Sequence, residues 1–247
     1  MRRSSAGIAL VVLVAMLAAA CQPGSPQAQR SPPPHGTAAP KSTPDPQRCD
    51  RLAKRGFTPC PPTADQLKLP PTTIKNATDG AVDDSTAKRW GRAFQLAQAY
   101  YYWALEENAR EALTAGVLSD TTAIENLFGP DLQDLDQAKQ EGGRLHSQLY
   151  TTPTTQAVAI PPALQDQIQG QGLTPKPFGL AVRFVGPASN TIVFPDGQKK
   201  VLSSVDASFV SDTLTWGELR SDPDLGEIWF EYGYYGCEGA VKSVCRF

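Results

Sequence analysis

The longest helical pattern in the chain runs through residues 83–116, DDSTAKRWGRAFQLAQAYYYWALEENAREALTAG. Asp83, Asp84 and Ser85 can cap the start of a helix, and Gly116 can end it. Between them, apolar residues recur at spacings of three, four and seven, which defines one face of an α-helix: Trp90, Phe94, Ala97, Tyr101, Leu105 and Ala112. Further aromatic residues surround the middle of this segment, so we expect a central helix packed on two sides rather than an exposed binding patch.

This helix would be unusually long for a compact domain if it were continuous. Residues 85–115 would extend over roughly 45 Å at 1.5 Å per residue, so we predict a kink or a break. Two shorter helices should follow. One starts near Asp120 and ends at Gly129, and the next starts at Pro130 and ends at Gly142.

Strand patterns dominate after residue 143. In chain order, the candidate strands are 144–150, 156–160, 178–185, 191–194, 199–203, 205–216 and 226–235. The turn sequence Pro195-Asp196-Gly197 predicts a hairpin, and the Gln-rich segment 163–172 can form a short helix or an ordered loop. Helices followed by antiparallel strands predict an α+β fold.

The last strand, 226–235, has a simple alternation. It predicts one face with Ile228, Phe230, Tyr232 and Tyr234, and a second face with Trp229, Glu231 and Tyr235.

The order of the elements from Ser85 to Tyr235, with a long aromatic first helix, resembles the nuclear transport factor and ketosteroid isomerase superfamily. In that cone-shaped fold, helices cover a strongly curved antiparallel sheet. The resemblance therefore implies N-terminal helices packed on a curved, mainly antiparallel sheet. The insertion between Pro153 and Pro177 departs from the family pattern, and a cystatin-like sheet with a single helix is an alternative.

The N-terminal segment has the pattern of a secretion signal. Arg2 and Arg3 precede an uncharged run, and Ala18-Ala19-Ala20 stand directly before Cys21. The run is shorter than the about 20 apolar residues of a membrane-spanning helix. This pattern resembles a bacterial lipoprotein signal peptide, although that family usually has Leu at the position of Ala18.

The resemblance implies cleavage before Cys21 and acylation of its thiol, with palmitate as an expected acyl chain. Ordinary secretory cleavage, which would leave a free thiol, and a retained anchor helix are the alternatives. We therefore expect a lipid anchor in the cell membrane and a mature chain on its extracytoplasmic face.

Composition then divides the chain into four parts. We expect a signal peptide in 1–20, a disordered Pro-rich tether in 21–47, a disulfide-stapled stem and linker in 48–82, and a globular domain in 83–247. The tether has eight Pro between residues 22 and 47 and no apolar side chain larger than Ala, so it cannot offset the entropy of ordering.

The stem and the body differ in charge. Residues 22–62 carry a formal charge of +4 and residues 63–247 carry −8. The basic residues of the stem, Arg48, Arg51, Lys54 and Arg55, are expected to lie near an anionic lipid surface, or simply to be solvated. The acidic body argues against nucleic acid as a partner, because such binding depends on neutralising phosphates.

Four cysteines remain when Cys21 is assigned to lipid. Cys49, Cys60, Cys237 and Cys245 form an even set suited to disulfides in an oxidising compartment. Three connectivities are open, of which we favour the two local pairs, Cys49–Cys60 and Cys237–Cys245. A metal site is the competing interpretation, but neither spacing is that of a zinc knuckle.

Chemical motifs are few. The sequence contains no phosphate-binding loop, dinucleotide fingerprint, His-Glu-x-x-His or Gly-x-Ser-x-Gly pattern. His35 lies in the tether, and His146 is interpreted as structural or exposed. Two acidic groups lack calcium-loop spacing and are interpreted as helix-start charges and a solvated turn: Asp131, Asp134 and Asp136, and Asp222, Asp224 and Glu227. We therefore expect no metal or cofactor.

These observations favour a non-catalytic module that binds a protein or a small molecule. A pocket for an apolar or sugar ligand would use Tyr101, Trp216, Trp229 and Tyr232, although aromatic residues at such spacing are more often core.

Two alternatives stay open. The cone-fold resemblance implies an enzyme acting on a small apolar substrate, with Asp206, Asp212 or Glu231 as the base beside a Tyr. A cell-wall or carbohydrate-binding module would instead use exposed aromatic residues such as Trp103 or Trp229.

Overall fold

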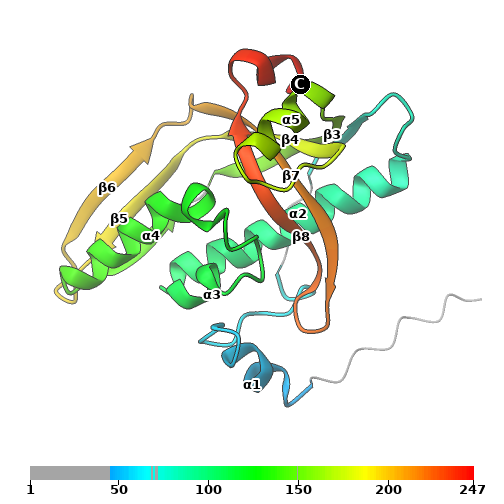
Figure 1. The fold of residues 1–247 in the computed structure, drawn as a ribbon. Coiled ribbons are helices and arrows are strands. Elements are labelled where there is room, and N and C mark those ends of the chain that lie inside the picture. Colours follow the sequence, from blue (N-terminus) through cyan, green and yellow to red (C-terminus); the bar gives the residue numbers. More distant parts are fainter. Residues whose placement is uncertain (1–44, 68, 70–71, 149) are drawn as a thin grey trace, which may run out of the picture. The chain divides into compact units, whose positions relative to one another are not determined.

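Four α-helices precede most of the strands in the computed structural model, which describes residues 45–247 except 68, 70, 71 and 149 (Figure 1). The α-helices are α1 (Arg48–Ala53), α2 (Asp84–Glu106), α3 (Arg110–Thr114), α4 (Ile124–Gln140) and α5 (Pro162–Gly170), and a 3-10 helix, η1 (Gly239–Ser243), lies near the C-terminus. The predicted signal peptide, the lipid site at Cys21 and the tether up to residue 44 lie outside the described residues. None of the described helices is long and apolar enough to cross a bilayer.

The strands form two sheets. They are β1 (Ile74–Ala77), β2 (Arg144–Gln148), β3 (Thr151–Ala159), β4 (Phe178–Val185), β5 (Ala188–Val193), β6 (Lys199–Val205), β7 (Val210–Asp222) and β8 (Gly226–Gly236). The larger sheet has the order β1-β3-β4-β7-β8, and the smaller has the order β2-β5-β6. Among the strands of the described residues, β1 and β3 alone pair in parallel. The predicted α+β class is therefore confirmed.

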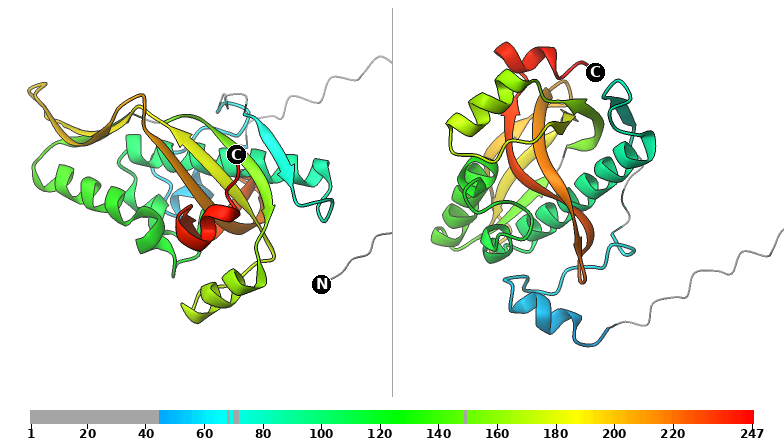
Figure 2. Two further views of the ribbon diagram at one scale, coloured as in Figure 1. Left: turned by 90° about the horizontal axis from the view of Figure 1, so that it is seen from above. Right: turned by 45° about the vertical axis from the view of Figure 1, so that its right-hand side comes forward.

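Three pairs of consecutive strands pass from one sheet to the other. Two residues separate β2 from β3 and β4 from β5, and four separate β6 from β7. The predicted strand 205–216 is therefore divided, because Asp206 holds a turn by accepting hydrogen bonds from the backbone and hydroxyl of Ser208 at 2.8 and 2.6 Å. Helices α2 and α4 pack against strands of both sheets (Figure 2).

The central helix α2 begins and ends at residues that the sequence marks. Asp83 caps it by accepting a hydrogen bond from the Thr86 backbone at 2.9 Å. Gly91 lets the helix approach the larger sheet closely, because a Cβ there would lie 2.8 Å from Ile74 and 2.9 Å from Thr155. The predicted break occurs at Asn108, which adopts a left-handed conformation with φ 57°.

The side chain of Asn108 makes this break a fixed joint. Its Nδ2 donates to the carbonyl of Leu145 on β2 at 3.0 Å, and its Oδ1 accepts from the backbone N–H of Leu145 at 2.8 Å. The end of α2 is thereby attached to the smaller sheet.

Helix α4 is one element where the sequence predicted two. Pro130 lies inside it, although proline usually starts or ends a helix because it lacks an N–H group. Ile124, Phe128, Leu132 and Leu135 are all buried in the main core. Burial of one continuous apolar face therefore outweighs the backbone hydrogen bond that Pro130 cannot make.

The other face of the larger sheet is covered by α5 and η1. Leu214 and Trp216 of β7 are buried there in a second core, with Ile168 of α5 and Val241 of η1. The Cys237–Cys245 disulfide lies at this end of the chain. The Gln-rich segment 163–172 is thus largely a helix, and its apolar residues hold it on the sheet.

Residues 48–82 belong to the same compact unit as residues 83–247, which differs from the predicted separate stem. Leu52 and Phe57 have no exposed surface and lie in the main core. Phe57 stacks on Trp103 of α2, with ring centroids 6.1 Å apart. The Cys49–Cys60 disulfide closes this segment, so both favoured cysteine pairs are present.

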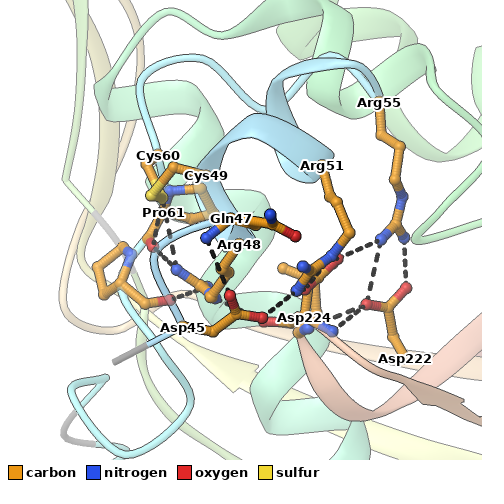
Figure 3. Close-up of polar contacts among 12 residues, drawn as sticks. Asp45, Gln47, Arg48, Cys49, Arg51, Arg55, Cys60, Pro61, Asp222 and Asp224 are labelled. Carbon is orange, nitrogen blue, oxygen red and sulfur yellow. Dashed lines mark hydrogen bonds and ion pairs between the residues drawn. A yellow bond between two sulfur atoms is a disulfide. The ribbon is translucent and has the colours of Figure 1, made fainter. Parts of the chain in front are cut away.

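Three arginines of α1 and the loop after it bind the β7–β8 hairpin (Figure 3). Arg51 forms an ion pair with Asp224, whose side chain is only 2% exposed. Arg55 pairs with Asp222, and Arg48 donates to the backbone carbonyl of Asp224 at 2.8 Å. These arginines therefore have partners within the protein, while the side chains of Arg51 and Arg55 are 41% and 30% exposed. That they lie near lipid stays a prediction.

Asp222 and Asp224 correspondingly do not form a solvated turn. Burial raises the pKa of Asp222, but the hydrogen bond from Arg55 and those from two backbone N–H groups more than offset this effect, so its pKa is lowered overall. The hairpin thus places ionised carboxylates opposite the arginines of α1 and the loop after it.

Candidate functional site

A cavity of about 420 Å³ lies between α2, α4 and strands of both sheets. Small-molecule sites typically have volumes of roughly 300–1,000 Å³. Among the described residues that line the cavity, seven carry aromatic rings: Phe94, Tyr101, Tyr102, Phe128, Tyr150, Phe184 and Tyr234. Hydroxyl and amide side chains fill the spaces between them, mainly on β2, β5, β6 and β7. This cavity is the candidate functional site.

The helical lining follows from helical spacing. Phe94, Gln98, Tyr101 and Leu105 recur every three or four residues along α2, so they share the face that points at the sheets. On α4, Phe128 and Asp131 line the cavity with Leu127. Tyr101 stacks on Phe128, with ring centroids 5.0 Å apart, which joins the two helices at the cavity wall.

A β-bulge in β8 decides which side chains reach the cavity from the larger sheet. Gly217 of β7 pairs with Glu231, but the preceding residue, Trp216, pairs with Gly233, so Tyr232 is an extra residue on β8. An extra residue shifts the alternation of a strand by one. Glu231 and Tyr234 therefore both line the cavity, although simple alternation predicts that they lie on opposite faces.

The carboxyl group of Glu231 is desolvated in this wall. Burial raises its pKa from 4.5 to about 7, and a hydrogen bond donated by the Thr215 hydroxyl acts in the opposite direction. Its backbone is held by the loop before α4, since Glu231 N–H donates to Leu118 at 3.1 Å and its carbonyl accepts from Asp120 at 2.8 Å. Glu231 is thus a rigidly placed carboxyl that changes charge near neutral pH.

A second carboxyl, Asp131, belongs to a hydrogen-bond network at the opposite wall. The Tyr101 hydroxyl and the Asn190 amide both donate to Asp131, the latter at 2.9 Å. Asn190 also donates to Asp134 at 2.7 Å and accepts from the Ser147 hydroxyl at 2.8 Å. Desolvation, followed by the neighbouring Asp131, raises the pKa of Tyr101 well above its usual value.

This network corrects the interpretation of the α4 carboxylates as simple helix-start charges. Asp131 faces the cavity, and desolvation raises the pKa of Asp134. Asp136 is the exception, because it pairs with Arg110 on the exposed surface. The three residues lie within six positions of each other in the sequence, but the helix directs Asp136 away from the side that carries Asp131 and Asp134.

Of the four predicted pocket residues, Tyr101 lines the cavity and three do not belong to its described lining. Trp216 is fully buried on the opposite face of the sheet, where its Nε1 donates to the Thr174 carbonyl at 3.0 Å. Trp229 is 2% exposed and packs against Trp90 of α2. Tyr232, the bulged residue, packs with the second core.

The other predicted chemical residues lie elsewhere. Asp206 holds the β6–β7 turn, and Asp212 pairs with Arg183 at 2.7 Å, so Glu231 alone of the three proposed bases reaches the cavity. His146 is exposed and faces Glu106 at 3.1 Å. Within the described part of the chain, no group of three or more His, Cys, Asp or Glu side chains could hold a metal ion.

Sequence reasoning missed several lining residues, notably Tyr150 and Tyr234. One signal was available for Tyr234, because glycine inside a strand often marks a bulge and Gly233 lies directly after Tyr232. Tyr150 lies between β2 and β3, where the chain passes from one sheet to the other.

Comparison of the chain with protein-family models, curated proteins and solved structures gives no match.

Proposed function

We propose that this is a lipid-anchored extracytoplasmic protein whose α+β body binds a small molecule, without converting it, in the cavity between α2, α4 and the sheets. The signal pattern that ends at Cys21 supports the anchor and the location. The Pro-rich composition of residues 21–47 supports a tether that leaves the body free to meet a ligand.

The cavity lining is the observation that carries the binding proposal. About 420 Å³ of open space lies between seven aromatic rings and a set of hydroxyl and amide groups, a volume within the usual range of small-molecule sites. Aromatic rings bind apolar parts of a ligand, and a few fixed polar groups orient it. The Asp131 network and the paired Glu231 provide such fixed polar groups.

The positions of the tryptophans favour this internal site over a carbohydrate-binding surface. Trp216 and Trp229 are buried. Trp103 stacks on Phe57, and Trp90 packs against Trp229 and Phe178. All four tryptophan side chains of the chain thus contribute to packing, whereas a wall-binding module would need such side chains at the surface.

A cavity-filling substitution tests the binding proposal. Thr213 lines the cavity from β7, so Thr213→Trp should occupy the site, whereas Thr213→Val keeps its volume nearly unchanged. With the full chain, a neutral fluorescent dye such as Nile red should bind to the wild type and to Thr213→Val, and Thr213→Trp should weaken its affinity by at least about tenfold. Equal affinity for all three proteins would contradict a role for the cavity.

The anchor has its own test. Intact mass spectrometry of the processed protein should give a chain that starts at Cys21 and carries diacylglycerol, and Cys21→Ser should abolish both features. A different first residue, or an unmodified Cys21, would remove the lipid anchor from the proposal while leaving the cavity argument intact.

Glu231 favours a second candidate function, a general acid–base enzyme acting on a small apolar substrate. A catalytic acid or base works best when its pKa lies near the working pH, and the pKa of Glu231 is about 7. Tyr101 and Tyr234 line the same cavity and offer phenol groups, as the resemblance to the cone superfamily would require.

Hydrogen–deuterium exchange into small ketones in heavy water, followed by NMR, tests this candidate without a known substrate. Exchange catalysed by the wild type and lost in Glu231→Gln would favour the enzyme. Exchange at the uncatalysed rate would favour the binding role.

A further inference from the structure

The charged side chains that face the cavity are all acidic. Glu231 lies in the wall formed by the larger sheet and Asp131 in the wall formed by α4. Among the described lining residues there is no Lys, Arg or His. The remaining polar groups are hydroxyls, phenols and amides, which are neutral at physiological pH. An anionic ligand would therefore meet negative charge without a positive partner.

The aromatic side chains gather where a positive charge would be attracted. Tyr101 contacts Tyr102 and Phe128, with ring centroids 5.2 and 5.0 Å apart. Tyr150 contacts Phe184 in a second group, at 5.4 Å. The face of an aromatic ring carries negative electrostatic potential and attracts ammonium groups, most strongly where water is excluded.

From this combination we infer that the ligand is an organic cation, either an amine or a quaternary ammonium compound with an apolar body. The inference rests on the proposed function, because it names the class of molecule that the same cavity takes. Carboxyl groups and aromatic faces both favour a cation over a neutral molecule of the same shape.

Glu231 is the better counter-ion of the two carboxyls. Asp131 already accepts hydrogen bonds from Tyr101 and Asn190. Glu231 accepts one from Thr215 through Oε1, and no other described side chain is seen to donate to it. Its second oxygen, Oε2, can therefore approach a ligand ammonium group.

Affinity for a permanent cation should then depend on pH. Glu231 is ionised above a pKa of about 7 and neutral below it, so affinity should rise as the pH rises through this range. The titratable groups that share the cavity are Asp131 from α4 and the phenols of four tyrosines: Tyr101, Tyr102, Tyr150 and Tyr234. Asp120 lies beside β8, where its N–H donates to the Glu231 carbonyl. Burial raises the pKa of Tyr101, Tyr102 and Tyr150, which therefore stay neutral.

A matched pair of probes tests the inference directly. Phenyltrimethylammonium and tert-butylbenzene have nearly the same shape and differ by one positive charge. Calorimetric titration of the full chain at pH 8 should show the cation binding at least about tenfold more tightly than its neutral isostere. Glu231→Gln should remove most of this preference, and Glu125→Gln, the same change at an exposed position on α4, should keep it.

The outcomes separate the two proposals. Equal affinity for both probes, or tighter binding of tert-butylbenzene, would overturn the cationic ligand class and leave the cavity as a binding site. If neither probe binds, and the dye binds Thr213→Trp as tightly as the wild type, both the cationic ligand class and the cavity as a binding site are overturned. A cation preference that persists in Glu231→Gln and does not vary between pH 5 and 8 would overturn the role of Glu231 as counter-ion.

Discussion

Replacing Glu231 by Gln should stabilise the protein at alkaline pH and change little at acid pH. Desolvation raises the pKa of Glu231 from its ordinary value of 4.5 to about 7, so the folded state resists ionisation of this group. At 1.36 kcal/mol per pKa unit, the difference corresponds to up to about 3 kcal/mol. The Gln side chain keeps an oxygen that can accept the hydrogen bond from Thr215.

The pH range follows from proton linkage. Below the ordinary pKa of 4.5, the carboxyl is protonated in the folded and the unfolded states, and it contributes nothing to the pH dependence. Between 4.5 and about 7 the folded state retains a proton that the unfolded state has released, so stability decreases as the pH rises. Above this range the wild type carries the full cost and Glu231→Gln does not.

Urea unfolding at several pH values between 4 and 9 measures this difference. The free energy of unfolding of Glu231→Gln minus that of the wild type should increase with pH and level off above the pKa of about 7. Any free-energy cost of the amide that does not depend on pH shifts this difference by a constant and leaves its change with pH unaffected. A flat or falling line for Glu231→Gln would refute the desolvated carboxyl.

Three further substitutions test how the N-terminal part of the body is held. Replacing Cys49 and Cys60 by Ala should lower the unfolding free energy by about 3 kcal/mol, as chain entropy predicts for this loop length, measured by urea titration. Asp224→Asn should leave Arg51 with only its exposed partner Asp45 and cost about 2 kcal/mol, and trypsin should then cleave α1 faster in limited proteolysis. Phe57→Ala should cost about 3–5 kcal/mol by thermal or urea unfolding if this segment is core; a loss below about 1 kcal/mol would instead support the separate stem that composition suggests.

The sequence predicted the features that depend on neighbouring residues. The capped start of α2 at Asp83 follows from local spacing, and the length of the pattern predicted a break without its position. The two local disulfides were favoured among three connectivities. The attachment of α1 to the body could not be predicted in this way. Arg51 and Asp224 are 173 residues apart in the chain, and a Pro- and Thr-rich composition between them gives no indication of a contact.

Helical periodicity also predicted the cavity better than strand alternation did. Tyr101 lies on the helical face identified from the sequence and lines the cavity. Alternation in a strand separates two faces but does not say which one borders a cavity, and here both faces are covered. Trp216 therefore packs beneath α5 and η1, although its neighbour Thr215 reaches the cavity.

The extra residue in β8, Tyr232, determines which side chains of this strand lie on the cavity face with Glu231. A protein with the same side chains but without Tyr232 would return to regular pairing beyond Trp216. Tyr234 would still pair with Thr215 on the cavity face, because Gly233 already lies opposite Trp216. If Tyr232 were kept and the strand paired without a bulge, Gly233 would lie opposite Thr215 and Tyr234 would turn to the other face of the sheet. The bulge thus keeps Tyr234 beside the carboxyl by absorbing one residue, so the binding chemistry depends on the register of β8 as well as on its side chains.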